Sequence, residues 1–311
     1  MVLVLVVLSL LSLLAMGLCH RVRLELKTAR MASDELRAYY LALGGINRAM
    51  AAIRQDRDEE LDHFGESWRL ATTAAAEGLL GEAAGEPAPG GYAPFVSYAV
   101  SDEEGRLNVN TSSPAGWVHL PGMSESVICA IVDWQDGDPE PTRDGAETSY
   151  YQREVYPYAA KDAATTMVWE LALVRGVSWW GFLGEDANGN GVLDDAEDDG
   201  PARWPLDNAD GRLDRGLWDV FTVYGDGKVN LNTASYEVLS ALPDVGPEGA
   251  RAVVSWRWGA DGVPFTGDDR HLERLEELAA VPGVTERQAE LLSEYGTLKS
   301  RHFRIVVEAG V

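Results

Sequence analysis

The sequence predicts an α+β protein in which a long N-terminal helix is followed by a few strands and by several helix-hairpin-helix units. Three observations predict this fold class: an apolar run at residues 1–18, a strand pattern that starts near residue 92, and a repeated motif built on a glycine turn. With 311 residues, of which 46% are hydrophobic, the chain can bury a sizeable core, and its length favours more than one domain.

The apolar run at residues 1–18 contains two polar side chains, Ser9 and Ser12, and no charged residue precedes Arg21. As an α-helix, about 18 residues span about 27 Å, which is just enough to cross the hydrocarbon core of a membrane. A removable secretory signal begins with basic residues and ends at a cleavage site of small residues. Because no basic residue precedes the apolar run, we expect an uncleaved transmembrane segment over residues 1–20.

The residues after the apolar run contain neither proline nor a turn cluster before Gly44. Their apolar side chains recur at steps of three and four, which is the spacing of one helix face. The sequence therefore predicts one long helix, apolar first and amphipathic afterwards, with a bend at Gly44 and Gly45. A shorter helix over residues 56–76 and a surface loop over 78–91 are expected to follow. The apolar positions of the amphipathic part are Leu36, Tyr40, Leu43, Ile46, Met50 and Ile53.

Residues 92–100 (YAPFVSYAV) are rich in aromatic and β-branched side chains and predict a strand. The turn at residues 102–105 (DEEG) leads into residues 106–110 (RLNVN), which have the pattern of a second strand. A short turn between two strand patterns favours a β-hairpin, so we expect these two strands to pair with each other.

One pattern occurs three times: a short apolar helix end, then Pro-Gly or Asp-Val-Gly, then a Ser, Thr or Pro that begins a second apolar-periodic helix. A tight glycine turn between two short helices is typical of helix-hairpin-helix units. Two of the repeats follow nearly the same phrase, RLNVNTSSP at Arg106 and KVNLNTASY at Lys228. The three repeats are Val118–Trp134, Leu239–Trp256 and Leu275–Leu292.

The acidic charge of the chain limits what these units can bind. Fifty acidic residues against 26 basic residues give a net charge of −24. Helix-hairpin-helix units often hold a DNA phosphate at the glycine turn, and such binding needs several Lys or Arg side chains. Acidic residues flank these turns instead, which disfavours nucleic acid and favours divalent cations. A membrane-anchored helix-hairpin-helix DNA receptor is the alternative function, and a basic surface would support it. The turns carry Glu125, Asp244, Glu248 and Glu286, with Arg251 and Arg287 as the nearest bases.

Residues 186–197 (DANGNGVLDDAE) match the twelve-residue EF-hand calcium loop at every diagnostic position. Gly191 permits the sharp turn at position 6, and Leu193 at position 8 is expected to pack inward. A hard cation takes about six to eight oxygen ligands, and this spacing wraps them around one point. An acidic solvated loop with accidental spacing is the other interpretation. The expected Ca²⁺ ligands are Asp186, Asn188, Asn190, Val192 through its backbone carbonyl, Asp194 and Glu197.

Two more acidic stretches accompany this loop. In residues 207–214 (DNADGRLD), half of the loop pattern recurs, but Leu206 and Leu217 occupy its positions 1 and 12, so an acidic turn is favoured over an independent site. Residues 133–147 hold carboxylates that could gather around a second cation or could belong to a solvated loop rich in Pro and Gly. The candidate ligands of this second site are Asp133, Asp136, Asp138 and Glu147, with Asp144 nearby.

The sequence contains no recognisable catalytic motif. The five histidines are scattered without an HExxH pair, and no GxSxG, P-loop or Rossmann pattern occurs. Paired carboxylates at residues 133–147 could serve acid and base chemistry, so a hydrolase is a third interpretation. We expect a protein that is not an enzyme.

Several phrases occur in an order that resembles the minor pseudopilin K family of type II secretion systems, also called general secretion pathway protein K. After the hydrophobic helix these phrases are GRLNVN, AIVDWQDGDPEP, GAETSYY, WELALVRGVS and VNLNTASYEVLSALP, and the similarity covers nearly the whole chain. The insertion EDANGNGVLDDAEDDG, followed by LDNADGRLDRG, resembles a subset of the family with an EF-hand-like calcium-loop insertion.

The resemblance implies a pilin-like fold, in which the long helix packs on a small antiparallel sheet and a large domain of helix-hairpin-helix (SAM-like) units is inserted among the strands. Family members bind calcium in the soluble part, which supports the second group of carboxylates as structural or metal-linked residues. The expected parts are a transmembrane segment (1–20), the pilin-like helix and first strands (21–110), a helical insert with the acidic loops (111–225), and a second helix-hairpin-helix region with a C-terminal strand (226–311).

The resemblance also implies a function, which is to cap the tip of a periplasmic pseudopilus and to assist protein export. The implied partners are other minor pseudopilins and the inner membrane, with secreted substrate or the outer-membrane channel as further candidates. Other pseudopilins carry a glutamate near the start of the mature helix that pairs with a neighbour's N-terminus, and K members lack it. In this chain, no acidic residue occurs before Glu25.

One departure from the family affects the expected topology. The family begins with a short basic leader that a prepilin peptidase removes, and we expect that such a leader precedes the present start or has been cut from it. Four basic residues follow the apolar run, so a count of positive charges alone would place the body in the cytoplasm. Because a leader would carry competing charges and a calcium loop favours the outside, we expect a single pass of the inner membrane with the body in the periplasm. The four residues are Arg21, Arg23, Lys27 and Arg30.

Overall fold

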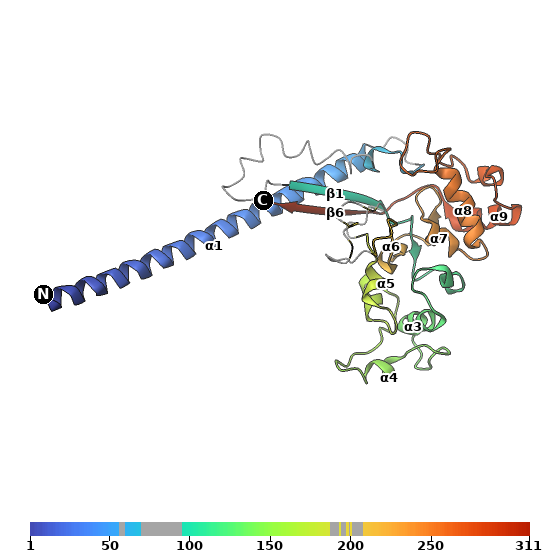
Figure 1. Cartoon of the computed structure of the whole chain (residues 1–311). Helices are drawn as coiled ribbons and strands as arrows, with labels where there is room; N and C mark the ends of the chain where they lie inside the picture. The colour runs from blue at the N-terminus through green and yellow to red at the C-terminus, as the bar shows by residue number, and fades with distance from the viewer. Residues whose placement is uncertain (56–59, 70–94, 187–192, 194–196, 199, 201–207) are drawn as a thin grey trace. The chain divides into compact units, whose positions relative to one another are not determined.

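The computed structural model describes residues 1–55, 60–69, 95–186, 193, 197–198, 200 and 208–311 (Figure 1). The described residues divide into two compact units. The first unit consists of residues 1–51, 95–98 and 307–311, and the second consists of residues 52–69 and 99–306, less the gaps just given.

Helix α1 runs from Val2 to Arg54, which confirms the predicted long N-terminal helix (Figure 1). The helix is long and apolar enough to cross a membrane, and its first apolar residues are exposed. It continues through Gly44 and Gly45, where the sequence predicts a bend. Gly45 instead serves packing, because a Cβ atom there would lie 2.8 Å from Val307 Cγ1 and 3.2 Å from Val96 Cγ2. The glycine lets the strands approach the helix closely.

Strands β1 (Phe95–Asp102) and β6 (Phe303–Gly310) pair with each other and run in opposite directions (Figure 1). The small antiparallel sheet that packs against the long helix therefore consists of a strand near residue 100 and a strand at the C-terminal end of the chain. The predicted hairpin is wrong, because β2 (Leu107–Asn108) pairs in parallel with β3 (Phe221–Thr222). After β1 the chain turns into the core of the second unit, where Leu107 and Val109 are buried.

The helix expected over residues 56–76 is also wrong where the structure describes it. Residues 60–66 are turn and irregular backbone, and only 67–69 are helical. Glu60 and Asp62 are held by the far end of the chain, since Lys299 Nζ lies 2.9 Å from Glu60 and the Asp62 amide donates to the carbonyl of Leu298. The surface loop expected over residues 78–91 lies outside the described residues.

The described residues contain four helix-hairpin-helix units, one more than the sequence indicated. The extra unit begins at Val168, and its turn (Arg175-Gly176-Val177-Ser178) has a glycine and a capping serine at the same positions as Gly122 and Ser124. Three of the four first helices are 3₁₀ helices of six residues, a form that is common in short connecting pieces. The units are η2 (Pro114–His119) with α3 (Glu125–Gln135), η3 (Val168–Leu173) with α5 (Trp179–Leu183), α7 (Tyr236–Ser240) with α8 (Gly246–Arg257), and η5 (Leu275–Ala280) with α9 (Glu286–Tyr295).

All four units close with the same pair of backbone hydrogen bonds. In the first unit the amide of Leu120 donates to the carbonyl of Trp117, and the amide of Met123 donates to the carbonyl of Leu120. The residue two positions after the first donor has a positive φ, which favours glycine and is tolerated by aspartate. The matching donors are Val174 and Val177, Leu242 and Val245, and Val281 and Val284, and the positive-φ residues are Gly122, Gly176, Asp244 and Gly283.

The four units form two similar halves. Each half starts with the shared Asn-containing phrase, continues with two units, and ends in a short strand that pairs in parallel with the phrase: β2 with β3, and β4 (Val229–Asn230) with β5 (Gly296–Thr297). In each half, the side chain of the second Asn of the phrase binds the backbone of one residue that precedes the second hairpin unit of that half. Asn110 accepts from and donates to Thr165, and Asn232 does the same with Leu272. The second compact unit therefore contains two structural copies of the same arrangement, one after the other in the chain.

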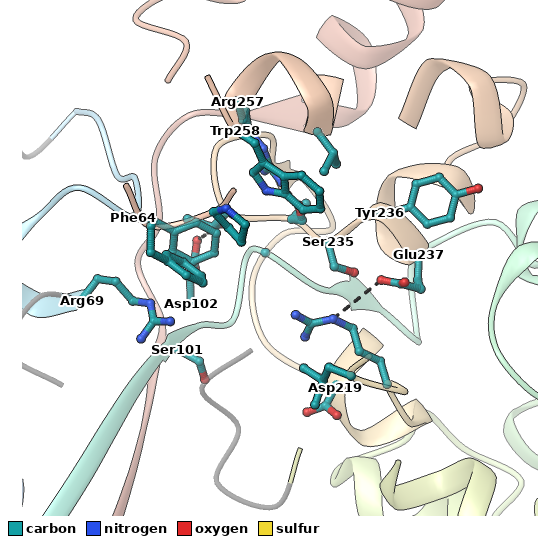
Figure 2. Close-up of a pocket in the computed structure, with 18 of the residues that line it drawn as sticks. Phe64, Arg69, Ser101, Asp102, Asp219, Ser235, Tyr236, Glu237, Arg257 and Trp258 are labelled. Carbon is teal, nitrogen blue, oxygen red and sulfur yellow. Dashed lines mark hydrogen bonds and ion pairs between the residues drawn. The ribbon is translucent and has the colours of Figure 1, made fainter. Parts of the chain in front are cut away.

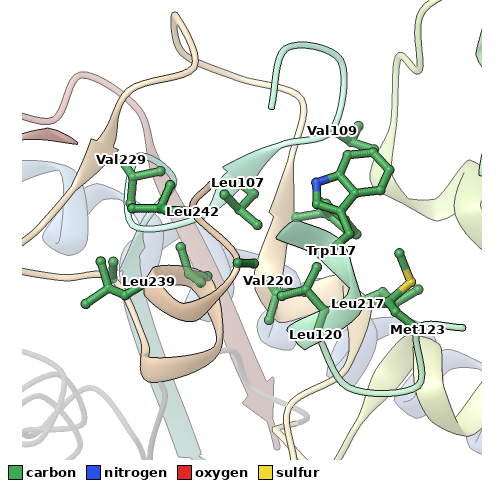
Figure 3. Close-up of a cluster of buried hydrophobic side chains, with 14 of the residues drawn as sticks. Leu107, Val109, Trp117, Leu120, Met123, Leu217, Val220, Val229, Leu239 and Leu242 are labelled. Carbon is green, nitrogen blue, oxygen red and sulfur yellow. The ribbon is translucent and has the colours of Figure 1, made fainter. Parts of the chain in front are cut away.

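One hydrophobic core runs through both halves (Figure 3). Leu107 and Val229, from the two short parallel pairs, point into it together with residues of the η2–α3 and α7–α8 hairpin units. Trp117 is 1% exposed and packs edge-on against Phe221, with ring centroids 5.0 Å apart. Two shorter helices, α4 (Thr148–Tyr151) and α6 (Leu217–Val220), complete this core with Tyr151 and Leu217.

We predict that Asn232→Ala destabilises the protein by about 2 kcal/mol, because it leaves the buried amide and carbonyl of Leu272 without partners. Asn110→Ala removes the two equivalent bonds to Thr165 and one from Gln135, but these bonds are only partly buried and Asn110 is exposed, so it is expected to cost less. Urea unfolding of the full chain in detergent with excess calcium measures both. Equal losses in the two variants would contradict the role of burial.

Candidate metal centres

Three carboxylates meet where helix α3 ends. Asp133 lies in the last turn of α3, Asp136 follows its final residue, and Glu147 precedes the first residue of α4. One oxygen from each lies within 4.8 Å of the others, and Asp133 and Glu147 are 0% and 3% exposed. Oxygen ligands at this spacing suit a hard divalent cation. This acidic triad could hold a metal ion.

The hydrogen bonds of the triad leave ligand positions open. Asp133 Oδ1 accepts from the amide of Thr142 at 2.9 Å. Among the described residues, Asp133 Oδ2 and Glu147 Oε1 are buried without a hydrogen-bond partner. Buried carboxylate oxygens are costly to leave unpaired, so a cation or a proton is the natural complement.

The electrostatics of the triad agree with this view. Burial, together with the charges of Asp133 and Asp136, raises the pKa of Glu147 to about 7. Desolvation likewise raises the pKa of Asp136. In the absence of a cation, like charges so close together cannot all ionise easily.

Gly145 makes room for this arrangement. A Cβ atom at this position would lie 2.0 Å from Asp133 Oδ2 and 3.0 Å from the carbonyl oxygen of Cys129. The other two predicted carboxylates lie outside the triad. Asp138 is exposed and accepts from the amide of Glu140 at 3.0 Å, and Asp144 lies 3.7 Å from the guanidinium of Arg175.

The predicted calcium loop at residues 186–197 is described only in part. Asp186 and Glu197, its first and last ligands, are 2% and 4% exposed. Leu193 is half-buried and lines a cavity, as expected for a residue that packs inward. Asn188, Asn190, Val192 and Asp194 lie outside the described residues. The structure thus buries both terminal carboxylates of the predicted loop, and the loop itself stays a prediction.

The acidic turn that follows supports the start of the loop. Glu185 accepts from the amides of Asn208 and Asp214, at 3.2 and 2.7 Å, and Gly184 forms a bridge with Arg215. The side chain of Asn208 donates to Asp214 at 2.9 Å. Residues 208–214 are therefore a closed acidic turn clamped around Glu185.

Sequence reasoning missed Asp219, which lies in the short helix α6. Asp219 is 4% exposed, and among the described residues neither carboxylate oxygen has a hydrogen-bond partner. Burial and the charge of Asp186 raise its pKa to about 7. The signal that could have identified it is an acidic residue between the core residues Leu217 and Val220.

A cavity of about 600 Å³ lies beside Asp219 (Figure 2). Its charged side chains mostly bind the protein itself. Arg257 donates to the carbonyls of Leu231 and Ala234, and Asp102 accepts from Ser300 and Thr233. These groups therefore act as internal supports of the cavity wall.

We predict that calcium-free protein loses stability as pH rises from about 4.5 to about 7. The pKa of Glu147 is higher in the folded state than its ordinary value of 4.5, so its contribution is present below that value and lost above the folded value. Asp102 and Asp219, with pKa values also raised to about 7, add to the fall. Glu147→Gln is expected to flatten the slope of melting temperature against pH, and exposed Glu140→Gln is the control. Identical slopes in all three proteins would contradict the assignment.

A family model, a protein of known sequence and a solved structure are each similar to this chain. The family model for type II secretion system (T2SS) protein K matches residues 118–179, which contain the triad. The chain is 26% identical over 320 residues to type II secretion system protein K of Pseudomonas aeruginosa, which covers 94% of this chain and 82% of the relative. Its fold is similar to a chain of the GspK-GspI-GspJ complex from the type 2 secretion system of enterotoxigenic Escherichia coli, with a TM-score of 0.52, 13% identity, and coverage of 91% of this chain and 89% of that one. The chain is thus similar in sequence and in fold to protein K of type II secretion systems.

Proposed function

We propose that this chain is a minor pseudopilin K of a type II secretion system, a structural subunit that assembles with other minor pseudopilins at the tip of a periplasmic pseudopilus. The similarity to protein K over 94% of the chain supports the family. The solved chain with the similar fold comes from a complex with GspI and GspJ, which makes their counterparts the proposed partners. The observation that carries the assembly function is an exposed apolar face on helix α1.

This α1 face consists of Leu36, Tyr39, Tyr40, Leu43 and Ile46. The five side chains recur at helical steps of three and four, so they share one side of the helix. Leu36 is 56% exposed, and the two tyrosines are each 62% exposed. So large an apolar stripe on a single chain marks an interaction surface.

The strands cover a different side of the same helix. Gly45 and Ala49, which are buried there, lie one helical turn apart and let β1 and β6 approach. The helix therefore presents small residues to its own sheet and large apolar residues to the exterior. A second long helix laid along the α1 face would bury it, as in a helix-in-groove contact.

The charges of the second compact unit, which we call the head, favour a capping function over a nucleic-acid receptor. Arg251 and Arg287, the bases nearest the hairpin turns, lie 2.9 and 3.1 Å from Glu248 and Glu290. Their charges are thus offset within the chain, which disfavours phosphate binding. In the proposed assembly, the apolar start of α1 anchors the subunit in the inner membrane, the body lies in the periplasm, and the bulky head blocks further addition at the tip.

We predict that Leu43→Glu abolishes co-purification with the GspI and GspJ counterparts of the same secretion system, because it places a charge in the middle of the α1 face. Arg48→Glu introduces the same side chain at another exposed position of α1 and is expected to leave capture intact. Capture of both variants at the wild-type level would contradict assembly through this face.

Calcium is the proposed ligand of the loop at residues 186–197. A ligand that binds only the folded state adds stability by mass action. The double variant Asp186→Ala with Glu197→Ala is expected to lose the calcium-dependent rise in melting temperature at this loop, and the rise that remains is assigned to the triad. Asp198→Ala, next to the loop, is the matched control. A melting shift that is unchanged in the double variant would refute the loop as a calcium site.

A further inference from the structure

The duplication provides an internal reference for exposed residues of the hairpin units. The third unit (η3 with α5) and the fourth unit (η5 with α9) share the same turn hydrogen bonds and the same capping hydroxyl, from Ser178 and Thr285. When the two are aligned on these bonds, burial agrees at each position of the second helix start: Phe182 and Ala289 are buried, and the residues before them are exposed or half-buried. The same backbone therefore exposes the same positions in both units.

Three of these exposed positions carry tryptophan in the third unit only. The fold does not require aromatic side chains there, because the other units are closed by the same turn with small, polar or charged residues. In the fourth unit (η5 with α9), the residues that correspond to Trp169, Trp179 and Trp180 are Glu276, Glu286 and Arg287. In the η2–α3 unit they are Ala115, Glu125 and Ser126, and in the α7–α8 unit they are Glu237, Pro247 and Glu248.

We call Trp169, Trp179 and Trp180 the tryptophan surface. Their side chains are 43%, 49% and 48% exposed. The ring of Trp169 lies 5.8 Å from that of Trp179 and 5.0 Å from the buried ring of Phe182, which fixes it in place. Rigid, half-exposed tryptophans are the residues that contribute most to binding at protein interfaces.

The geometry and charge of this region restrict the partner. The rings of Trp169 and Trp179 are tilted by 43° to each other, so they offer no common plane on which a sugar chain could lie. Residues 133–186, which contain the third unit, hold 11 acidic residues against 4 basic ones. Complementary charge on a partner steers its approach and excludes acidic competitors.

We infer that the tryptophan surface docks a protein segment whose apolar side chains are flanked by Lys or Arg. The tryptophan surface lies in the second compact unit of the chain. The inference does not depend on the α1 face or on calcium binding. A lipid surface is the competing occupant, because tryptophan is also common at membrane interfaces.

Site-specific photo-crosslinking in cells of the source organism tests this inference with the full chain. A benzoylphenylalanine in place of Leu173, which is 51% exposed on the same short helix as Trp169, is expected to yield a product with one protein segment. Mass spectrometry of that product should identify apolar residues next to Lys or Arg. The same probe at Ala280, the equivalent exposed position of the fourth unit, is the matched control and should not yield it.

The decisive variant carries Trp179→Glu and Trp180→Arg, the residues that the fourth unit has at these positions. Because the same backbone already accommodates them, the chain is expected to fold, and its level and calcium-dependent melting check this. The crosslink from position 173 should fall by at least about tenfold. The inference is overturned by an undiminished crosslink in this variant, by an equal product from position 280, by an acidic partner segment, by a lipid adduct alone, or by no product.

Discussion

The buried side chain of Asn230 is the interaction on which the second unit most depends. Its amide nitrogen lies 3.1 Å from the carbonyl of Asp62, 3.1 Å from Asp102 Oδ2 and 2.8 Å from Ser300 Oγ. These partners are 168, 128 and 70 residues away along the chain. A fully satisfied buried network of this kind specifies one arrangement, because each group removed leaves others unpaired. The segment after α1, the end of β1 and the segment between β5 and β6 are joined here to the duplicated core.

The duplication explains where the calcium loop could be inserted. In the second half, α9 ends at Tyr295 and β5 begins at Gly296, so the hairpin unit runs directly into its closing strand. In the first half, residues 184–216 separate α5 from α6 and its following strand. A long connection adds loop entropy and little core of its own, and a bound cation offsets that entropy. The insertion thus extends a scaffold that closes without it in the other copy.

Local patterns in the sequence were sufficient for the long helix and for three hairpin units, because helical periodicity and glycine turns are short-range signals. The η3–α5 unit escaped notice since its Arg175-Gly176 lacks the Pro-Gly of the first unit, although the capping Ser178 was visible. The hairpin prediction failed because strand pairing is set by distant partners: β1 meets the last strand of the chain, and β2 meets Phe221. The same limit applies to the sites. Spacing located the triad, but only the fold separates Asp138 from it and places Asp219 beside Asp186.

The acidic triad and the proposed calcium loop are both linked to the tryptophan surface, the triad through hydrogen bonds and the loop through the chain itself. Arg175, in the turn of the third unit, donates to the carbonyl of Gly145 at 2.9 Å, and Gly145 packs against the triad residue Asp133. Tyr158 donates to the carbonyl of Leu173 at 2.8 Å, at the other side of the same turn. A cation that neutralises the triad therefore also stiffens the loop that holds this turn, and with it the start of α5. Since α5 leads directly into Glu185 and the proposed calcium loop, the tryptophan surface lies along the chain between the acidic triad and that loop. Under the proposed calcium binding and periplasmic location, cation sites on both sides of the tryptophan surface would fill only outside the cytoplasm, where calcium is abundant.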